Sequence, residues 1–342
     1  MKAYLLKKSG KPGVLKISEV PEPLAMQREV MVRLHYAGIN YSEILSRKGL
    51  YGWAPRRPYI PGMEGVGEIV AVGESVPNKR VGEKVIVGAQ HGCYAEYISV
   101  PEDQVLPVVT ELTLKENAAI LVNYLTAWIA LIKLGRLQKG EKVLITVAAG
   151  GVGTAAVQIA RHIDAQVYAM VGSDEKRAFI ESLGARKGYN YQDLGIFDEV
   201  RKDTGGADVV LEMYGGKVYH NSRKLLNPFG RIVVMGYASL ALNYWNPLSV
   251  WRAWRGIPRV SISELSEQST GVMSGHLGYL LYKPELLRNI YEEMMVFIKE
   301  NRIKPVIDRV YTFEELPAAH RYIEARRQKG KVVIDIIQAG KQ

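Results

Sequence analysis

The sequence is poor in cysteine and has no long uninterrupted hydrophobic run. Its 342 residues include one cysteine, Cys93, which excludes an intrachain disulfide and a cysteine-rich zinc site. The longest apolar stretch, 118–132, contains Asn123 and Thr126. It is shorter than the ~18 residues that a membrane-spanning helix needs, and it predicts a buried helix. The N-terminal stretch lacks the apolar core of a secretory signal, so we expect a cytoplasmic protein in a reducing compartment.

Acidic residues are fewer than basic ones, since 35 Asp and Glu against 45 Lys and Arg give a net charge of +10. Such an excess suits nucleic acid, an acidic membrane surface or an anionic cofactor, or it is a solvated basic surface. None of the usual nucleic-acid-binding motifs is present. We therefore expect no nucleic-acid partner, and peripheral membrane contact stays a minor alternative.

The sequence shows two different patterns along its length. Residues 1–110 consist of short alternating segments separated by glycine, proline and asparagine, which is typical of a β-rich region. From about residue 120, strand-like and helix-like runs alternate: KVLITVAA, TAAVQIARHI, QVYAMVG, DEKRAFIESLGA, DVVLEMY and RIVVMGY. That alternation predicts a parallel sheet with crossover helices, and the fold class expected is α/β.

The strongest motif is KVLITVAAGGVGTAAVQIARHI. An apolar strand, 143–148, enters a glycine turn, and an amphipathic helix follows from Thr154. The fingerprint G-x-G-x-x-G fits with Ala148 in place of the first glycine, then Gly150 and Gly153. Because a helix N-terminus offers free N–H groups and partial positive charge to phosphates, the motif predicts a dinucleotide site. A second glycine-rich stretch, PGMEGVGEIVAVGESV, leads into a strand and predicts no such site.

The end of the second alternating strand bears on the choice between NADP and NAD. An NAD-binding fold places an acidic residue there, on the ribose 2′-hydroxyl. Here QVYAMVG ends at Gly172, Ser173 follows, and Lys176 lies in the first turn of the next helix. A hydroxyl and an ammonium suit a 2′-phosphate. Asp174 counts slightly against this, unless its side chain caps the helix. The sequence predicts NADP(H).

A set of further stretches spreads over nearly the whole chain: AGINYSEILSRKGLY, PGMEGVGEIVAVG, GCYAEYISVP, VNYLTAW, AAGGVG, VGSDEK, NY and GKVVI. Together they resemble the zinc-free medium-chain dehydrogenases/reductases of the quinone oxidoreductase type. Within that group, GHLGYL and the tryptophan-rich insert before it look most like the vesicle amine transport protein homologues. The resemblance implies a GroES-like catalytic domain formed by residues 1–122 and 276–342, a Rossmann NADP-binding domain over 123–275, a site between them, and a homodimer.

The resemblance also implies roles for individual residues. The nicotinamide end of the cofactor is expected beside Tyr41, Asn123, Thr126, Gly236, Tyr237, His276 and Leu277. The pyrophosphate is expected at Gly150, Gly151, Val152 and Gly153, and the adenosine 2′-phosphate at Gly172, Ser173, Lys176 and Tyr191. Arg326 is expected to reach the cofactor from the C-terminal segment.

No metal is expected. The positions of the zinc ligands in related alcohol dehydrogenases correspond here to Asn40 or its neighbours, Met63 and Asn123. A thioether and an amide are poor ligands for Zn²⁺, which prefers thiolate, imidazole and carboxylate. The four-cysteine structural lobe is absent as well. Glu43 replaces the aspartate common in relatives, which leaves its role open.

A substrate class follows from the expected absence of zinc. A simple ketone needs strong polarisation before it accepts hydride, whereas a quinone or an α,β-unsaturated carbonyl is already electron-poor. Positioning plus one hydrogen-bond donor then suffices. The catalytic candidates are Tyr41 and Tyr51, followed by Tyr124, with Asn40 as an orienting group. Each tyrosine has the alternative role of a buried or cofactor-packing aromatic.

The insert NYWNPLSVWRAWRG, residues 243–256, concentrates tryptophan and arginine. It predicts an apolar lid over the substrate pocket or a packed seam, with membrane contact as the alternative. The function expected is an NADPH-dependent, zinc-independent reductase of quinones or α,β-unsaturated carbonyls. Two alternatives stay open: an enoyl-thioester reductase, and a non-catalytic NADPH-binding protein that acts at membranes or with partners.

Overall fold

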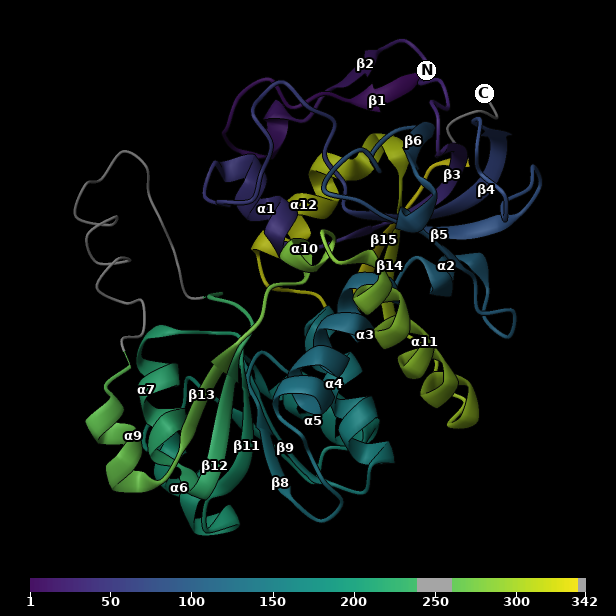
Figure 1. Cartoon of the computed structure of the whole chain (residues 1–342). Coiled ribbons are helices and arrows are strands. Elements are labelled where there is room, and N and C mark those ends of the chain that lie inside the picture. The colour runs from purple at the N-terminus through teal and green to yellow at the C-terminus, as the bar shows by residue number, and fades with distance from the viewer. Residues whose placement is uncertain (239–259, 338–342) are drawn as a thin grey trace. The chain divides into compact units, whose positions relative to one another are not determined.

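The computed structural model describes residues 1–238 and 260–337 (Figure 1). Contacts between residues divide the chain into two units. Unit 1 comprises Met1–Leu125 and Leu277–Gln342, and unit 2 comprises Thr126–His276. Helix α3 (Leu121–Trp128), which continues as the π-helical stretch η3 (Ile129–Leu134), contains the first boundary. The expectation for the insert 243–256 lies outside the described residues.

Unit 2 is built on a six-stranded parallel sheet. Its strands lie in the order β10 (Lys187–Asn190), β9 (Gln166–Val171), β8 (Lys142–Ile145), β11 (Ala207–Glu212), β12 (Leu226–Val234) and β13 (Gly271–Ser274). Numbered along the chain, this is the order 3-2-1-4-5-6 of the dinucleotide-binding fold. The expected α/β class with a parallel sheet is confirmed.

Helices cover both faces of that sheet. α4 (Gly151–His162) and α5 (Asp174–Leu183) lie on one side, and α6 (Ile196–Thr204), α7 (Gly216–Lys224) and α9 (Ile262–Gln268) lie on the other (Figure 1). α4 buries Ala156, Ile159 and Ala160, and these small or branched side chains allow a close approach to the strands. Because both faces are covered, the central strands read as continuous apolar runs.

Unit 1 holds a seven-stranded, mainly antiparallel sheet. Its order is β14 (Ile307–Thr312), β15 (Lys331–Asp335), β3 (Glu29–Ile39), β4 (Glu64–Val72), β5 (Lys84–Gly88) and β7 (Val105–Pro107), with β6 (Tyr97–Pro101) paired to β3. β15 pairs antiparallel with β3, Val332 opposite Ile39. The C-terminal segment thus joins the sheet of the N-terminal strands. A separate pair is formed by β1 (Lys2–Tyr4) and β2 (Ile17–Glu19).

Helices and 3-10 turns of varied length accompany the sheet of unit 1. They are α1 (Tyr41–Lys48), α2 (Leu114–Asn117), α10 (Leu277–Leu280), α11 (Pro284–Glu300) and α12 (Leu316–Glu324), with the 3-10 turns η1 (Pro12–Val14), η2 (Glu102–Gln104) and η4 (Phe313–Glu315). Alternate residues of β3, namely Val30, Val32 and Leu34, point into a shared core with residues of α12 such as Leu316.

Two expected boundaries around the glycine loop are wrong. The strand expected over 143–148 ends at Ile145, and the helix expected from Thr154 begins at Gly151. The strand stops early because Val147 adopts a left-handed backbone, with φ of 52°, which breaks the extended conformation. Glycines have no side chain and so show no apolar periodicity, which is why the first turn of α4 could not be recognised as helical from the sequence.

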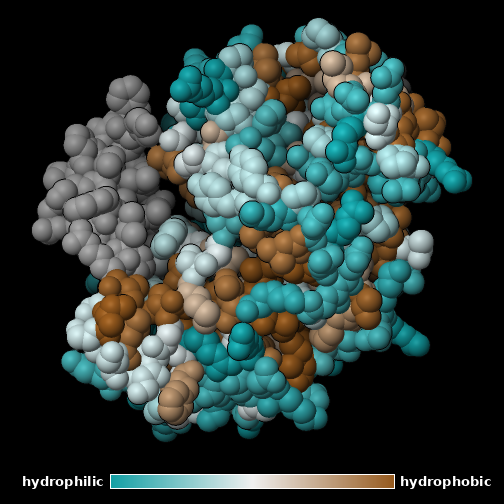
Figure 2. Space-filling view, in the orientation of Figure 1, coloured by the Kyte–Doolittle hydropathy of each residue, from teal (hydrophilic) through white to brown (hydrophobic). Residues whose placement is uncertain are grey.

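Hydrophilic and hydrophobic residues are mixed over the face seen in Figure 2. Exposed apolar side chains include Leu194, Phe229 and Ile262, and single exposed apolar residues are ordinary in globular proteins. Among the described residues, no helix combines the length and hydrophobicity needed to cross a membrane.

Candidate functional site

The candidate cofactor residues of unit 2 gather at one edge of its sheet. All strands of the sheet are parallel, so the segments that follow them emerge at the same carboxyl edge. Those segments carry Gly150–Gly153 after β8, Gly172–Lys176 after β9, Tyr191 after β10, Gly236 and Tyr237 after β12, and His276 after β13. The order of the strands reverses between β8 and β11: β9 and β10 lie on one side of β8, and β11, β12 and β13 lie on the other. In open α/β sheets ligands bind at such a switch point.

Gly150 and Gly153 have different local reasons for being glycine. A Cβ on Gly153 would lie 2.5 Å from the carbonyl oxygens of Val147 and Ala148, so only glycine lets α4 pack on the loop at this distance. A Cβ on Gly150 would lie 3.4 Å from the Val147 oxygen, which is nearly ordinary contact. Gly150 is the N-cap of α4 with φ of −80°, a value that any residue adopts. Its lack of a side chain therefore serves something outside the chain's own packing.

The end of β9 places a capped helix where the 2′-phosphate was expected. Ser173 is the N-cap of α5, and its Oγ accepts a hydrogen bond from the Lys176 backbone nitrogen at 3.4 Å. Asp174 does not cap this helix: it is the first helical residue, and its carboxylate pairs with Arg177 at 3.4 Å. Ser173 still has its hydroxyl proton to donate, and the half-buried Lys176 lies on the first turn of α5.

The side chain of Tyr191, the residue after β10, packs against Gly172, the residue after β9. A Cβ on Gly172 would lie 2.6 Å from the Tyr191 hydroxyl oxygen, so glycine allows this approach. The Tyr191 ring also lies 4.9 Å from the ring of Tyr214, centroid to centroid. The structure thus brings Gly172 and Tyr191 together, and it adds Tyr214, which sequence reasoning missed.

Glu212 is a second residue that sequence reasoning missed. It ends β11 with no exposed surface, and its Oε1 accepts hydrogen bonds from the backbone nitrogens of Tyr214 and Gly215, each at 2.6 Å. Burial raises the pKa of this carboxyl group to about 7, against the lowering effect of those two N–H groups. The sequence signal that could have identified Glu212 is an acidic residue at the end of an apolar strand, as in DVVLE.

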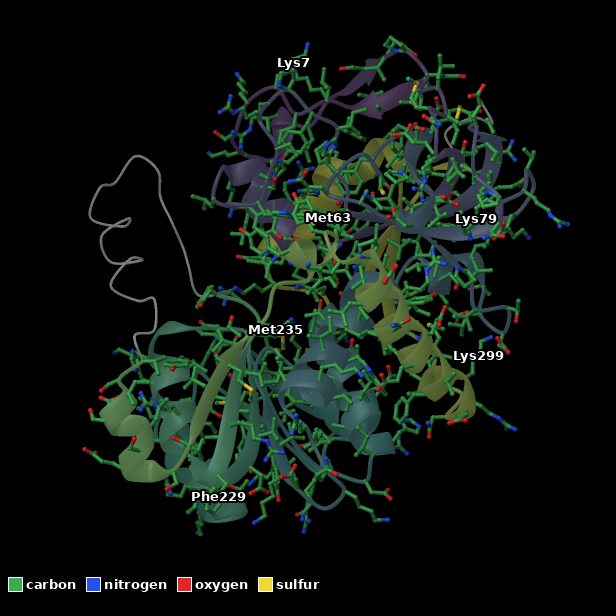
Figure 3. The ribbon with its side chains drawn as sticks, viewed as in Figure 1. Lys7, Met63, Lys79, Phe229, Met235 and Lys299 are labelled. Carbon is green, nitrogen blue, oxygen red and sulfur yellow. The ribbon has the colours of Figure 1, made fainter. Side chains whose placement is uncertain are left out.

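The remaining cofactor candidates are spread over both units. In unit 2, Thr126 is buried on α3, and Gly236 and Tyr237 follow Met235, which Figure 3 labels at the end of β12. Burial lowers the pKa of the half-buried His276. In unit 1, Asn123 is buried on α3, Leu277 begins α10, and Arg326 is exposed just after α12.

The chemistry of unit 2 fits a dinucleotide. A glycine loop follows β8 at the carboxyl edge of the sheet, and the helix N-terminus after it has no acidic residue in its first turn.

In unit 1, Asn40 and Glu43 join a buried polar network at the start of α1. The Glu43 carboxylate accepts hydrogen bonds from the Asn40 and Met63 backbone nitrogens at 3.0 and 2.8 Å. The Tyr94 hydroxyl and the Asn40 Nδ2 also donate to it. Burial raises the pKa of Glu43, and these donors oppose that rise. Met63, labelled in Figure 3, packs its sulfur 3.3 Å from the Ser42 hydroxyl.

Lys331 supplies the cation of this network. Its ammonium forms an ion pair with Glu64 in which both side chains are almost fully buried, at 2% and 1% exposure. It also donates to Asn40 Oδ1 at 2.7 Å and to Asn123 Oδ1 at 3.5 Å. Gly38 makes room for it, because a Cβ there would lie 2.6 Å from the lysine Cε. Neither Lys331 nor Glu64 was singled out by the sequence.

The three tyrosine candidates differ in environment. Tyr41 is half-buried against the core of unit 1, and Tyr51 packs its ring edge to face on Trp53, with centroids 6.4 Å apart. Burial raises the pKa of Tyr51, so at neutral pH its hydroxyl remains protonated and able to donate. Tyr124 is 2% exposed, which favours the core role that was its alternative.

Asn40, Met63 and Asn123, which correspond to zinc-ligand positions in related alcohol dehydrogenases, do not form a metal site. In the part of the chain that the structure describes, no three His, Cys, Asp or Glu side chains gather as metal ligands would. Two of the corresponding residues, Asn40 and Asn123, direct their amide oxygens at the Lys331 ammonium. A zinc ion does not fit this arrangement, because a buried cation already holds these oxygens. Independence from zinc in solution stays a prediction.

Comparison with known proteins identifies the chain. A 3-2-1-4-5-6 parallel sheet with a glycine loop, in one chain with a β-rich unit, defines a dinucleotide-binding protein of the dehydrogenase class. Residues 26–110 match the family described as alcohol dehydrogenase GroES-like domain, and residues 183–334 match the one described as zinc-binding dehydrogenase. The chain belongs to the medium-chain dehydrogenases/reductases of the quinone oxidoreductase type.

Individual relatives support this placement. The synaptic vesicle membrane protein VAT-1 homolog of Homo sapiens is 33% identical over 308 residues, which cover 90% of this chain and 78% of that protein. The quinone oxidoreductase of Mus musculus is 30% identical over 98% of this chain and 97% of that protein. The quinone oxidoreductase of Thermus thermophilus, solved alone and with NADPH, is 34% identical with a TM-score of 0.80, covering 98% of this chain and 100% of that one.

Proposed function

We propose that this protein is an NADPH-dependent, zinc-independent reductase of quinones or α,β-unsaturated carbonyls. The observation that carries the proposal is the carboxyl edge of unit 2. There the glycine loop precedes α4, and Ser173 and Lys176 stand where an NAD-binding fold would have a carboxylate. The Thermus thermophilus relative was solved with NADPH, which supports the same cofactor here.

The cofactor would be held by residues of unit 2. The pyrophosphate would lie on Gly150, Gly151, Val152 and Gly153 and the N-terminus of α4, and the 2′-phosphate beside Gly172, Ser173, Lys176 and Tyr191. Thr126, Gly236, Tyr237 and His276 would border the nicotinamide. The family resemblance adds Asn123, Leu277 and Arg326 as further proposed cofactor residues. When bound, NADPH supplies a hydride to the electron-poor carbon of the substrate.

The catalytic part of the proposal concerns hydrogen bonding in unit 1. Hydride arrival places negative charge on the substrate's carbonyl oxygen, and a nearby O–H or N–H group stabilises that charge. Tyr41 and Tyr51 are the proposed hydroxyl donors, and Asn40 orients the start of α1. An already activated quinone or enone needs no metal for this step. We extend the proposal to a cytoplasmic homodimer, by analogy with the family.

A second candidate function is favoured by two observations. The VAT-1 homolog of Homo sapiens bears the name of a synaptic vesicle membrane protein, and this chain has a net charge of +10. Both suit an NADPH-binding protein that acts at an acidic membrane surface without turnover. Turnover separates the two functions.

The first experiment follows NADPH oxidation by chelator-treated protein with an ortho-quinone, with NADH in parallel. We expect turnover that survives the chelator and strongly prefers NADPH. Lys176→Ala should weaken NADPH binding about tenfold or more and leave NADH unchanged, because it removes a positive charge beside the 2′-phosphate, a group that NADH lacks. Lys202→Ala is the matched control. Lys202 is exposed near the end of α6, the helix that leads to the amino end of β11, and so lies away from the carboxyl edge of the sheet. NADPH binding without turnover on any quinone or enone would favour the second function.

A further inference from the structure

The buried ammonium of Lys331 lies in a pocket of oxygen atoms that resembles a cation site. Lysine has three N–H donors, and three acceptors surround this one: Glu64 Oε1, Asn40 Oδ1 and Asn123 Oδ1. All four residues are at most 6% exposed. The ammonium therefore has a partner for every proton, as buried charges require.

The lysine decides which way two amide groups face. An ammonium only donates, so the oxygen atoms of Asn40 and Asn123 must point at it and their Nδ2 atoms must point away. The Asn40 Nδ2 then meets Glu43 and Glu64, at 3.3 and 3.0 Å. The Asn123 Nδ2 has no hydrogen-bond partner among the described residues, and it is not one of the enclosed polar atoms. Asn123 thus presents an N–H donor that Lys331 has oriented.

We propose that Lys331 is a positioning residue that takes the place of a metal ion, and that it holds the Asn123 amide as a hydrogen-bond donor to a carbonyl oxygen. The inference rests on the proposed function. The carbonyl belongs either to the quinone or enone substrate or to the carboxamide of the nicotinamide, which share the same chemistry. A metal ion would polarise a carbonyl directly, whereas Lys331 acts through an amide, and this weaker assistance suits an electron-poor substrate.

The test must remove the ammonium without leaving a buried carboxylate unpaired. Lys331→Met alone would leave the buried Glu64 carboxylate without its ion-pair partner. The informative variant therefore combines Lys331→Met with Glu64→Gln, which keeps the site neutral. Glu64→Gln alone is the reference for the double variant, because the two proteins differ only in Lys331 and the reference retains the contact of the ammonium with Asn123. Thermal unfolding confirms that each variant is folded. Affinities for NADPH, and for an ortho-quinone in the NADP⁺ complex, are then measured by fluorescence quenching alongside kcat and KM.

Relative to Glu64→Gln, the double variant should lose about tenfold in one of the two affinities, because one oriented hydrogen bond is removed. A loss in quinone affinity and kcat, with NADPH affinity unchanged, assigns the carbonyl to the substrate. A loss in NADPH affinity, with affinity for 2′,5′-ADP unchanged, assigns it to the nicotinamide carboxamide. Asn123→Leu should give the same loss, and it should add nothing in the double-variant background.

Two results would overturn the inference. One is a folded double variant whose affinities for NADPH and quinone both equal those of the unmodified protein. The other is a loss that multiplies when Asn123→Leu is added, since Lys331 would then act independently of that amide. Absence of turnover in the unmodified protein would defeat the proposed function alone, because both affinities are measured without turnover.

Discussion

At the scale of single residues, Glu212 of unit 2 is a carboxyl group whose pKa burial raises toward neutrality. Glu212 is fully buried with a pKa of about 7, well above its ordinary 4.5. Between these two values the folded chain binds a proton that the unfolded chain releases. Stability contributed by this group is therefore present at low pH and is lost as pH rises through this window, by up to about 3 kcal/mol.

Glu212→Gln should remove this dependence. Glutamine can still accept from the backbone nitrogens of Tyr214 and Gly215, and it stays neutral at every pH. The unfolding free energy of the variant relative to the unmodified protein should therefore rise by about 3 kcal/mol between pH 4.5 and pH 8, as measured by urea unfolding at each pH. Glu267→Gln, at an exposed position of α9, should show no such change. A pH-independent difference for Glu212→Gln would rule out a buried titrating carboxyl group.

Residues differ in how far the sequence reveals them. Ser173 and Lys176 could be proposed from the sequence because the fingerprint fixes a spacing along a short stretch of chain. Lys331 was not, because it meets Asn40 across 291 positions of sequence, and a lysine in an apolar strand carries no sign of its partner. Contacts of this kind exist only once β15 has paired with β3.

At the scale of elements, the junction of β8 and α4 separates packing from binding. Gly153→Ala would press a Cβ onto backbone atoms of Val147 and Ala148 at 2.5 Å, which cannot yield as a side-chain tip would. We expect a cost of about 1–3 kcal/mol. Gly150→Ala meets ordinary contact distances and should cost no more than about 1 kcal/mol as a changed N-cap.

In ligand binding, the variant with the smaller effect on stability, Gly150→Ala, should have the larger effect. Gly150→Ala should weaken NADPH binding about tenfold or more, because the pyrophosphate approaches that backbone closely. Urea unfolding and NADPH fluorescence titration of both variants measure the contrast. Equal affinity of Gly150→Ala and the unmodified protein would mean that the glycine loop does not hold the pyrophosphate.

The strand–turn–helix pattern of this junction was readable from the sequence, but its boundaries were not. Apolar alternation and the run AAGGVG located β8, the loop and α4 in the right order. The left-handed backbone of Val147, with φ of 52°, has no sequence signal, because valine disfavours that conformation. Local geometry imposed by the surrounding fold decided the ends of both elements.

At the scale of the whole molecule, alternation of strand and helix patterns was enough to predict the α/β class, and the motifs taken together were enough to place the family. Each motif alone was weak. Their joint occurrence over the chain was specific because it required both a β-rich region and a dinucleotide loop in one sequence. The polar network of Asn40, Glu43, Glu64 and Lys331 is a property of the folded sheet, and it depends on long-range pairing that no motif encodes.

Chelation provides a test of the whole molecule. If the cation of unit 1 is the covalently bound ammonium of Lys331, dialysis against a strong zinc chelator removes nothing, and the unfolding transition should stay unchanged. NADPH at about a hundred times its dissociation constant should still stabilise the protein by about 2.7 kcal/mol. Elemental analysis should find zinc well below one atom per chain, with a zinc-dependent alcohol dehydrogenase treated in parallel as the control. Stoichiometric zinc, or a transition that falls on chelation and recovers with added zinc, would contradict a metal-free protein.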